Sequence, residues 1–262
     1  MLNPIYTPKN TRAVHLLHYD WTGWLKDQAA FPATLSDAIK NCRDLWASDG
    51  MKLEKRESRL GQLQLMFNVI PQLSPSLFVQ RVKGRLSHAL RKAGTPVQFR
   101  VKKGFRSLGK NTREIVQAYI AKQSRKSDYV DPRFRKRLEQ FHVDNRAVAL
   151  KEASATGHGR YWYNLHLVLV VQDRRFPMER NDTFLKARNT ILAIAKKKGY
   201  AIAELFVMPD HIHVALRGNI EHSPQDIALA FLNNLSYVFG YNRVWNEEYY
   251  VGTFGEYRLD QV

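Results

Sequence analysis

The sequence predicts an α+β fold in which helices pack on an antiparallel sheet, with this pattern present twice in tandem. In both halves of the 262-residue chain, strand-like stretches alternate with amphipathic helical ones. In addition, the ungapped offset that carries Gly50 onto Gly199 also carries Ser74-Pro75 onto Ser223-Pro224 and aligns the apolar pattern of residues 50–90 with that of 199–239. A chain of this length is sufficient for one large domain or two small ones with their own cores.

The predicted elements follow the same order in each half. They are a strand at 13–19 and 163–171, a helix at 35–48 and 184–198, a strand pair within 53–67 and at 201–208 with 211–216, and a second helix at 74–92 and 223–239. Serine as N-cap with proline at the first helical position favours a helix start at Ser74 and at Ser223. We therefore divide the chain into a first half (1–123), a basic and polar linker with a short helix across 132–141 (124–159), and a second half (160–262).

The charge of the chain indicates a polyanionic partner. Lys and Arg number 41 against 24 acidic residues, which gives a net charge of +17. Such an excess attracts nucleic acid over a long range. A single cysteine, Cys42, excludes an intramolecular disulfide, and the apolar run 165–171 is too short to span a bilayer. We expect a soluble cytoplasmic protein that does not enter a membrane.

The histidine pair His211-Ile212-His213 is the strongest chemical signal. Residues two apart on a strand point to the same face, so both imidazoles can reach one divalent ion. A bare His-x-His is more often two polar-face histidines without a ligand. At the same offset the first half carries Gln62 and Gln64, and neutral amides are poor ligands for a catalytic divalent ion. The first half is thus expected to have lost its metal site, or to be an ordinary strand with a polar outer face.

Two segments of the second half resemble a known family. Residues 208–213, Met-Pro-Asp-His-Ile-His, and residues 250–255, Tyr-Val-Gly-Thr-Phe-Gly, resemble the IS200/IS605-like single-tyrosine transposases of the HUH class, which include the REP-associated tyrosine transposases. The resemblance implies a ferredoxin-like, HUH-type sandwich and a Mg²⁺ or Mn²⁺ ion held by His211 and His213. It also implies that the protein cleaves and rejoins single-stranded or hairpin DNA through a phosphotyrosine intermediate.

In that family the attacking tyrosine follows a glycine by about ten residues, and a metal-binding glutamine follows the tyrosine by four. Counted from Gly255, the tyrosine would lie beyond residue 262, whereas Gly109 is followed at this distance by Tyr119 and then by Gln123. Residues i and i+4 share a helix face, so these two side chains can project together. We therefore expect one composite site in which Tyr119 and Gln123 complete the histidine pair of the other half, either within one chain as a pseudo-dimer or in a homodimer.

Several alternatives remain open at this point. Tyr257 and Gln261 also fit Tyr-x-x-x-Gln, but only five residues follow Tyr257, which is short for a packed helix. The chain could instead be an inactive or truncated derivative that only binds hairpin or single-stranded DNA. A relaxase with the same histidine pair and an unrelated metallohydrolase, active without Tyr119 and Tyr257, are further rivals. His158, His166 and His222 are interpreted as ordinary surface or core histidines.

The nucleic-acid surface is predicted from basic and aromatic side chains. The basic candidates for phosphate contacts are Lys83, Arg85, Arg100, Lys102 and Lys103. The aromatic candidates for stacking on unpaired bases are Phe99, Phe105, Tyr249, Tyr250 and Phe254.

Overall fold

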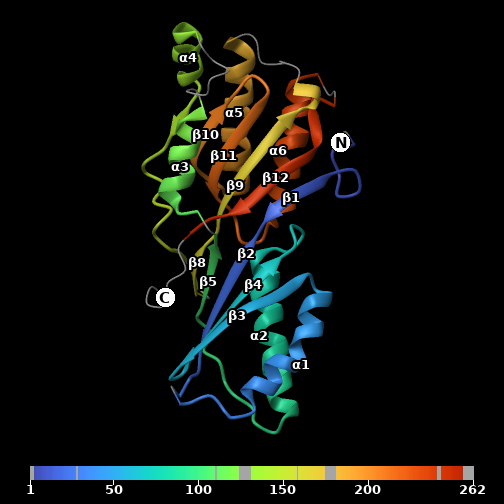
Figure 1. The fold of residues 1–262 in the computed structure, drawn as a ribbon, viewed down its shortest axis with the longest axis vertical. Coiled ribbons are helices and arrows are strands. Elements are labelled where there is room, and N and C mark those ends of the chain that lie inside the picture. The colour runs from blue at the N-terminus through green and yellow to red at the C-terminus, as the bar shows by residue number, and fades with distance from the viewer. Residues whose placement is uncertain are drawn as a thin grey trace.

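Two six-stranded sheets and the helices packed on them make up the fold (Figure 1). The computed structural model describes residues 3–27, 29–109, 111–123, 131–157, 159–174, 181–240 and 243–255. Most neighbouring strands are antiparallel, so the predicted α+β class with helices on an antiparallel sheet is confirmed. Two parallel pairs, β1 with β12 and β5 with β8, were not predicted. No helix in these described ranges is long and apolar enough to cross a membrane.

We call the two sheets the C-terminal sheet and the N-terminal sheet. The C-terminal sheet has the order β1 (Arg12–Leu16), β12 (Trp245–Thr253), β9 (Asn164–Val171), β11 (His211–Arg217), β10 (Ala201–Val207) and β6 (Val143–Asp144). The N-terminal sheet has the order β3 (Met51–Arg59), β4 (Gln62–Val69), β2 (His18–Trp24), β5 (Lys103–Leu108), β8 (Gly159–Trp162) and β7 (Ser154–Thr156).

The two sheets exchange strands reciprocally. Strand β1 directly precedes β2 in the chain but pairs with β12, whereas β8 directly precedes β9 but pairs with β5. The single strand predicted at 13–19 is therefore wrong: the chain leaves one sheet and enters the other at Leu17, whose side chain is fully buried. Each sheet thus depends on a strand supplied from the other side of the molecule.

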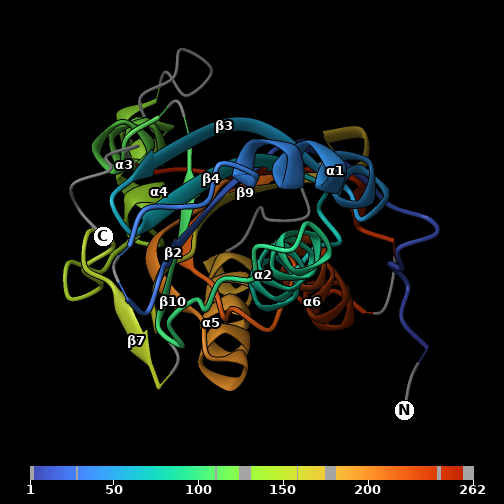
Figure 2. The ribbon, with the colours of Figure 1, turned by 90° about the horizontal axis from the view of Figure 1, so that it is seen from below.

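Four long helices cover the sheets: α1 (Leu35–Ser48), α2 (Pro75–Lys92), α5 (Asn181–Lys198) and α6 (Pro224–Val238). Ser74 and Ser223 cap α2 and α6 as predicted, each accepting a hydrogen bond from a backbone N–H of its first turn. Figure 2 shows α2, α5 and α6 grouped on one side of the molecule, with α3 (Arg113–Ala121) and α4 (Pro132–Glu139) on the other. Strands β6 and β7 and helix α4 all lie in the stretch 124–159, so its described residues carry regular structure as well as loops.

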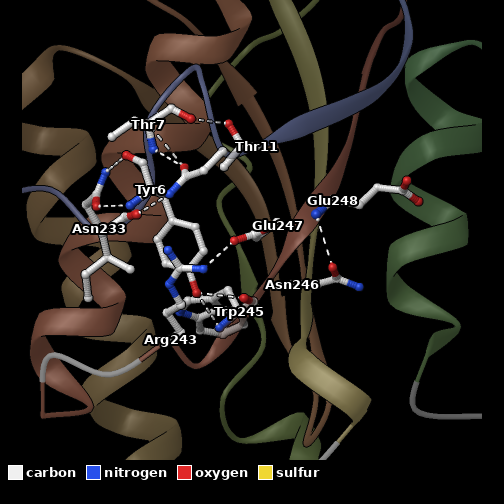
Figure 3. Close-up of polar contacts among 11 residues, drawn as sticks. Tyr6, Thr7, Thr11, Asn233, Arg243, Trp245, Asn246, Glu247 and Glu248 are labelled. Atoms are coloured by element: carbon white, nitrogen blue, oxygen red, sulfur yellow. Dashed lines mark hydrogen bonds and ion pairs between the residues drawn. The ribbon is translucent and has the colours of Figure 1, made fainter.

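The N-terminal segment is fixed by Tyr6, whose contacts are drawn in Figure 3. The buried Tyr6 hydroxyl donates to the carbonyl of Trp245 at 2.6 Å and accepts from its backbone N–H at 2.8 Å. The side chain of Asn233 on α6 bonds both the N–H and the carbonyl of Tyr6, at 2.9 and 2.8 Å. These contacts hold the chain beside β12 just before β1 begins.

Two matched segments cross where the sheets meet. Ser107 Oγ accepts from the N–H of Asn164 at 2.8 Å, and Thr253 Oγ1 accepts from the N–H of His18 at 2.9 Å, so the two hydroxyls play equivalent parts. At the crossing a Cβ on Gly109 would lie 2.2 Å from the carbonyl oxygen of Thr253. Only glycine, which has no Cβ, avoids this overlap. Beyond Gly109 the first half passes over to the C-terminal sheet, where α3 packs on β10 and β11 (Figure 1).

Candidate functional site

The histidine pair lies on the face of β11 that α3 partly covers. Ile212 and Val214 are fully buried on the opposite face, as the alternation of side chains along a strand requires. The rings of His211 and His213 have centroids 4.9 Å apart. On the neighbouring strand β9, His166 stands opposite Ala215 and therefore shares the face of the pair.

His211 is oriented by an acidic neighbour. Its Nδ1–H donates to Asp210 Oδ1 at 2.6 Å, and Arg174 donates to Asp210 Oδ2 at 2.8 Å. Burial raises the pKa of Asp210, but the hydrogen bonds and charges of His211 and Arg174 outweigh it and hold that pKa below its usual value. Asp173 and Arg174 both have left-handed backbone angles, φ 54° and 51°, at the turn that brings Arg174 to this carboxylate.

His213 is oriented by His166. Nε2 of His166 and Nδ1 of His213 lie 3.2 Å apart, within hydrogen-bonding distance, and the rings are nearly parallel at 16°. Burial lowers the pKa of His166 to about 4, so this ring is neutral at physiological pH. A neutral imidazole offers one donor and one acceptor, and can therefore select the tautomer of His213.

Tyr119 reaches the histidines from the other half of the chain. Its ring centroid lies 5.5 Å from that of His213 and 6.0 Å from that of His166, edge-on to both. The side chain is 47% exposed, so it borders the solvent at the same time. The structure thus brings a first-half helix against the second-half histidine pair.

Gln123 follows Tyr119 by one helical turn and is almost fully buried. Its Nε2 donates to the carbonyl of Tyr119 at 2.9 Å, while among the described residues its Oε1 has no hydrogen-bond partner. A buried carbonyl oxygen without a partner is costly unless something binds it.

A second contact anchors α3 on the sheet. Gln117 Nε2 donates to Glu204 Oε2 on β10 at 3.4 Å, and His142 Nε2 lies 2.7 Å from Glu204 Oε1. No local sequence pattern predicts this anchor, because its residues lie far apart in the chain. The same holds for His166, which is a neighbour of His213 and not an ordinary surface or core histidine.

The predicted metal ligands are His211, His213 and Gln123, two imidazoles and a side-chain amide. No group of three or more His, Cys, Asp or Glu side chains in the described part of the chain is placed to hold a metal ion. Two imidazoles on one face together with the partnerless Gln123 Oε1 provide nitrogen and oxygen donors of the kind that Mn²⁺ and Mg²⁺ accept.

A cavity of about 410 Å³ opens beside Tyr119. Its lining comes from both halves: Asn111, Ile115, Val116, Tyr119, His166, Val168 and Tyr250. It therefore lies between α3 and the strands β9 and β12.

The equivalent face of the N-terminal sheet holds a buried ion pair. Gln64 stands opposite Thr22, and Asp20 stands opposite Met66, the register positions that correspond to His213 and His166 in the other sheet. Asp20 is fully buried and lies 3.7 Å from Arg106 Nε. Burial raises the pKa of Asp20 to about 6 against the opposing effect of Arg106. The positive charge beside Asp20 on this face is therefore the guanidinium of Arg106.

The predicted nucleic-acid residues lie mainly away from this cavity. Lys83 and Arg85 are on α2, where Arg85 forms an ion pair with Asp49, and Lys83 donates to the carbonyl of Arg100 at 3.2 Å. Lys102 and Lys103 lie at the start of β5. Of the predicted stacking residues, four are buried core side chains and not free to stack on a base, namely Phe99, Phe105, Tyr249 and Phe254. Tyr250 alone of the five borders the cavity, and Tyr257 falls outside the described residues.

Comparison with known proteins finds a family match for the second half. Residues 160–262 match a family model described as transposase, IS200-like, which confirms the predicted resemblance over that segment. A candidate transposase from Deinococcus radiodurans R1 is similar in structure, with 22% identity and a TM-score of 0.34 over 39% of this chain and 86% of that one. A REP-associated tyrosine transposase, solved bound to a REP hairpin, is similar with 11% identity and a TM-score of 0.33 over 36% and 58% of the two chains. No curated protein matches the chain.

Proposed function

We propose that this chain, whose residues 160–262 match the IS200-like transposases, cleaves and rejoins single-stranded DNA with Tyr119 as the nucleophile. The observation that carries the proposal is the contact between the Tyr119 ring and the ring of His213, at 5.5 Å. It joins a tyrosine helix from one half to a histidine pair from the other. A tyrosine that serves only to pack the core is normally buried, whereas Tyr119 is 47% exposed and lines a cavity.

In the proposed reaction the Tyr119 oxygen attacks the phosphorus of one phosphodiester. The tyrosine hydroxyl gives up its proton, the P–O3′ bond breaks, and the leaving 3′ oxygen takes a proton to become a free hydroxyl. The phosphotyrosyl bond retains the energy of the broken bond, so a 3′-hydroxyl can later attack it and restore the strand.

We further propose that His211, His213 and Gln123 hold a Mg²⁺ or Mn²⁺ ion. Since Nδ1 of each ring faces Asp210 or His166, the nitrogen that would meet the metal is Nε2 in both. When bound, the ion would polarise the scissile phosphate and offset its developing charge. The buried Gln123 Oε1 supports the assignment, because coordination would satisfy it.

DNA is the proposed partner on grounds of charge. A net charge of +17 favours a polyanion, and we propose Lys83, Arg85, Arg100, Lys102 and Lys103 as phosphate contacts on the first half. Of these, Arg85 would have to exchange its ion pair with Asp49 for a phosphate. The reciprocal exchange of β1 and β8 supports a pseudo-dimer within one chain, in which the tyrosine of one half serves the histidines of the other.

A covalent trap tests the nucleophile. Single strands from the flanks of the gene are incubated with the protein and Mn²⁺, and the DNA-bearing peptide is mapped by mass spectrometry after a denaturing gel. We expect an adduct on Tyr119 that is absent in Tyr119→Phe and in His211→Ala. Tyr237→Phe is the matched control, since that tyrosine is 62% exposed on α6.

The other outcomes each contradict part of the proposal. An adduct on Tyr257 would show that the second half carries its own nucleophile. Cleavage that survives both Tyr119→Phe and Tyr257→Phe would point to a metallohydrolase. Binding of hairpin DNA without any adduct would leave an inactive derivative as the function.

A further inference from the structure

The face of the C-terminal sheet that carries the histidines is only partly covered. Helix α3 packs on β10 and β11, whereas the same face of β9, β12 and β1 carries no helix among the described elements. A second cavity of about 490 Å³ lies there, lined in part by Val14, Val168, Val170 and Tyr250. Val168 and Tyr250 also line the cavity beside Tyr119, so the two hollows form one groove.

The floor of this groove is apolar by strand alternation. Along β9, Leu165, Leu167 and Leu169 are fully buried in the core, while Val168 and Val170 are partly exposed on the open face. On the edge strand, Val14 is 47% exposed. Apolar side chains on an open face beside a reactive group indicate a binding surface.

Tyr250 lies along the sheet and does not stand out from it. A Cβ on Gly252 would lie 2.4 Å from the Tyr250 hydroxyl and 3.0 Å from its Cζ, so the ring folds back over the glycine. Its edge meets His166, with ring centroids 5.7 Å apart at 66°. A ring lying on the sheet in this way can present a face to an incoming planar group.

The ring of Tyr250 is also close to the proposed nucleophile. His166 contacts both Tyr119 and Tyr250, so three rings run in sequence from α3 to β12. Burial raises the pKa of Tyr250, and the neighbouring Tyr119 raises it further. A base stacked on Tyr250 would therefore be separated from Tyr119 by the rings of Tyr250 and His166.

We propose that this groove binds the unpaired nucleotides next to the scissile phosphate, with one base stacked on Tyr250. Every base has a flat face that stacks on an aromatic ring, which makes such a platform tolerant of sequence. Arg174, which lines the groove and pairs with Asp210, and Arg12, which pairs with Glu248 in the lining, are both exposed and suit the backbone of a strand. The subsite rests on the proposed function, because its place beside Tyr119 defines which nucleotides it holds.

Binding is measured in a Tyr119→Phe background, so that no strand is cleaved. We expect Tyr250→Ala to weaken the affinity for a fluorescent single-stranded oligonucleotide by roughly 5- to 100-fold, since one base loses its stacking partner. Tyr250→Phe should bind as the parent does, and so should the control Tyr237→Ala, at an exposed position on α6. The Gly252→Val change should weaken binding as well, because its side chain displaces the Tyr250 ring.

A photo-crosslink locates the base without any substitution at Tyr250. Oligonucleotides carrying iodouracil at successive positions near the cleavage point are irradiated with the otherwise unaltered Tyr119→Phe protein. We expect a crosslink to Tyr250 from one position only. Crosslinks confined to other residues, or unchanged binding by Tyr250→Ala, would overturn the subsite.

The design separates this proposal from the proposed reaction. If no adduct forms on Tyr119 but Tyr250→Ala weakens binding, the proposed strand cleavage fails, and the groove remains a single-strand binding surface with a base on Tyr250. If the adduct forms and Tyr250→Ala binds normally, the subsite alone fails. A concentration-dependent dimer of the free protein that Tyr250→Ala abolishes, seen by sedimentation with DNA binding unaltered, would assign the groove to a second copy of the chain and overturn the subsite.

Discussion

The two histidines of the pair are oriented through the same ring atom by different means. Asp210 accepts from Nδ1 of His211, while His166 lies within hydrogen-bonding distance of Nδ1 of His213. Such outer partners fix the tautomer and direction of a metal-binding imidazole. His166 is held neutral by burial, so it can do this without bringing a second charge beside the metal ion proposed for the pair.

We predict that His166→Ala lowers the Mn²⁺ affinity by about 10- to 100-fold, the usual cost of losing an outer partner. Titration calorimetry on the DNA-free protein measures this directly. His88→Ala on α2 is the control, because that side chain is exposed and outside the site. An unchanged affinity in His166→Ala would mean that His213 is held by its packing alone.

The histidine pair could be predicted from the sequence because its geometry is local. Two residues that lie two positions apart on a strand point to the same face of the sheet. His166 could not, because its contact with His213 depends on the pairing of β9 with β11, which joins residues 47 apart in the chain. Tyr119 was found only through the expected spacing from Gly109. The burial of four of the five predicted stacking residues was missed for the same reason as His166, since the inward face of each strand is set by tertiary packing.

At the scale of elements, the crossing at Gly109 places α3 over the other sheet. We predict that Gly109→Ala destabilises the protein by about 1–3 kcal/mol, because the new Cβ would overlap the carbonyl oxygen of Thr253. Urea unfolding measures the loss, and the yield of the Tyr119 adduct should fall in parallel as α3 is displaced.

Gly84→Ala is the matched control for this change. Gly84 lies within α2, and a Cβ there meets no atom within 4 Å. Alanine should therefore stabilise the protein by up to about 1 kcal/mol through helix propensity. If both alanine variants behaved alike, the close approach at Gly109 would not control the fold.

The hydrogen bonds of Tyr6, which hold the segment before β1, give a second prediction at this scale. Tyr6→Phe removes one hydroxyl and leaves both the N–H and the carbonyl of Trp245 buried without this partner. We expect a loss of about 1–3 kcal/mol in unfolding free energy, measured in urea. Tyr237→Phe, at an exposed position, should be neutral. A neutral Tyr6→Phe would mean that Asn233 alone holds the segment.

Some elements of the fold can be predicted from local sequence, and others cannot. The helix starts at Ser74 and Ser223 and the strands on either side of Pro209 follow from local sequence chemistry. The exchange of β1 and β8 does not, since a short strand reads the same whichever sheet it joins. Strand order depends on the partner, and that information lies outside any single segment.

At the scale of the whole molecule, the exchanged strands link the two halves into one structure. Tyr19 of the first half and Tyr163 of the second pack edge-on with ring centroids 6.1 Å apart, so the apolar core continues between the sheets. The first half, which lacks the histidine pair, therefore contributes to the stability of the whole molecule. Its ion pair of Asp20 with Arg106 occupies the face where the other half has its site.

The buried carboxyl group of Asp20 makes stability depend on pH in a defined direction. Burial raises the pKa of Asp20 from its ordinary value of 3.8 to about 6, so the folded protein keeps a proton that the unfolded chain releases. The stabilisation is fully present below about pH 4 and is lost as the pH rises through 6. A shift of about two pH units corresponds to about 3 kcal/mol in unfolding free energy. Asp20→Asn cannot ionise and lacks this dependence.

The measurement is urea unfolding of the parent and of Asp20→Asn between pH 4 and pH 7. We expect the unfolding free energy of the parent, relative to the variant, to fall by up to about 3 kcal/mol across this range. Asp37→Asn, at an exposed position on α1, should keep the parental slope. Equal slopes for the parent and Asp20→Asn would mean that Arg106 holds Asp20 ionised throughout, because an ion pair strong enough to offset burial leaves no proton to release.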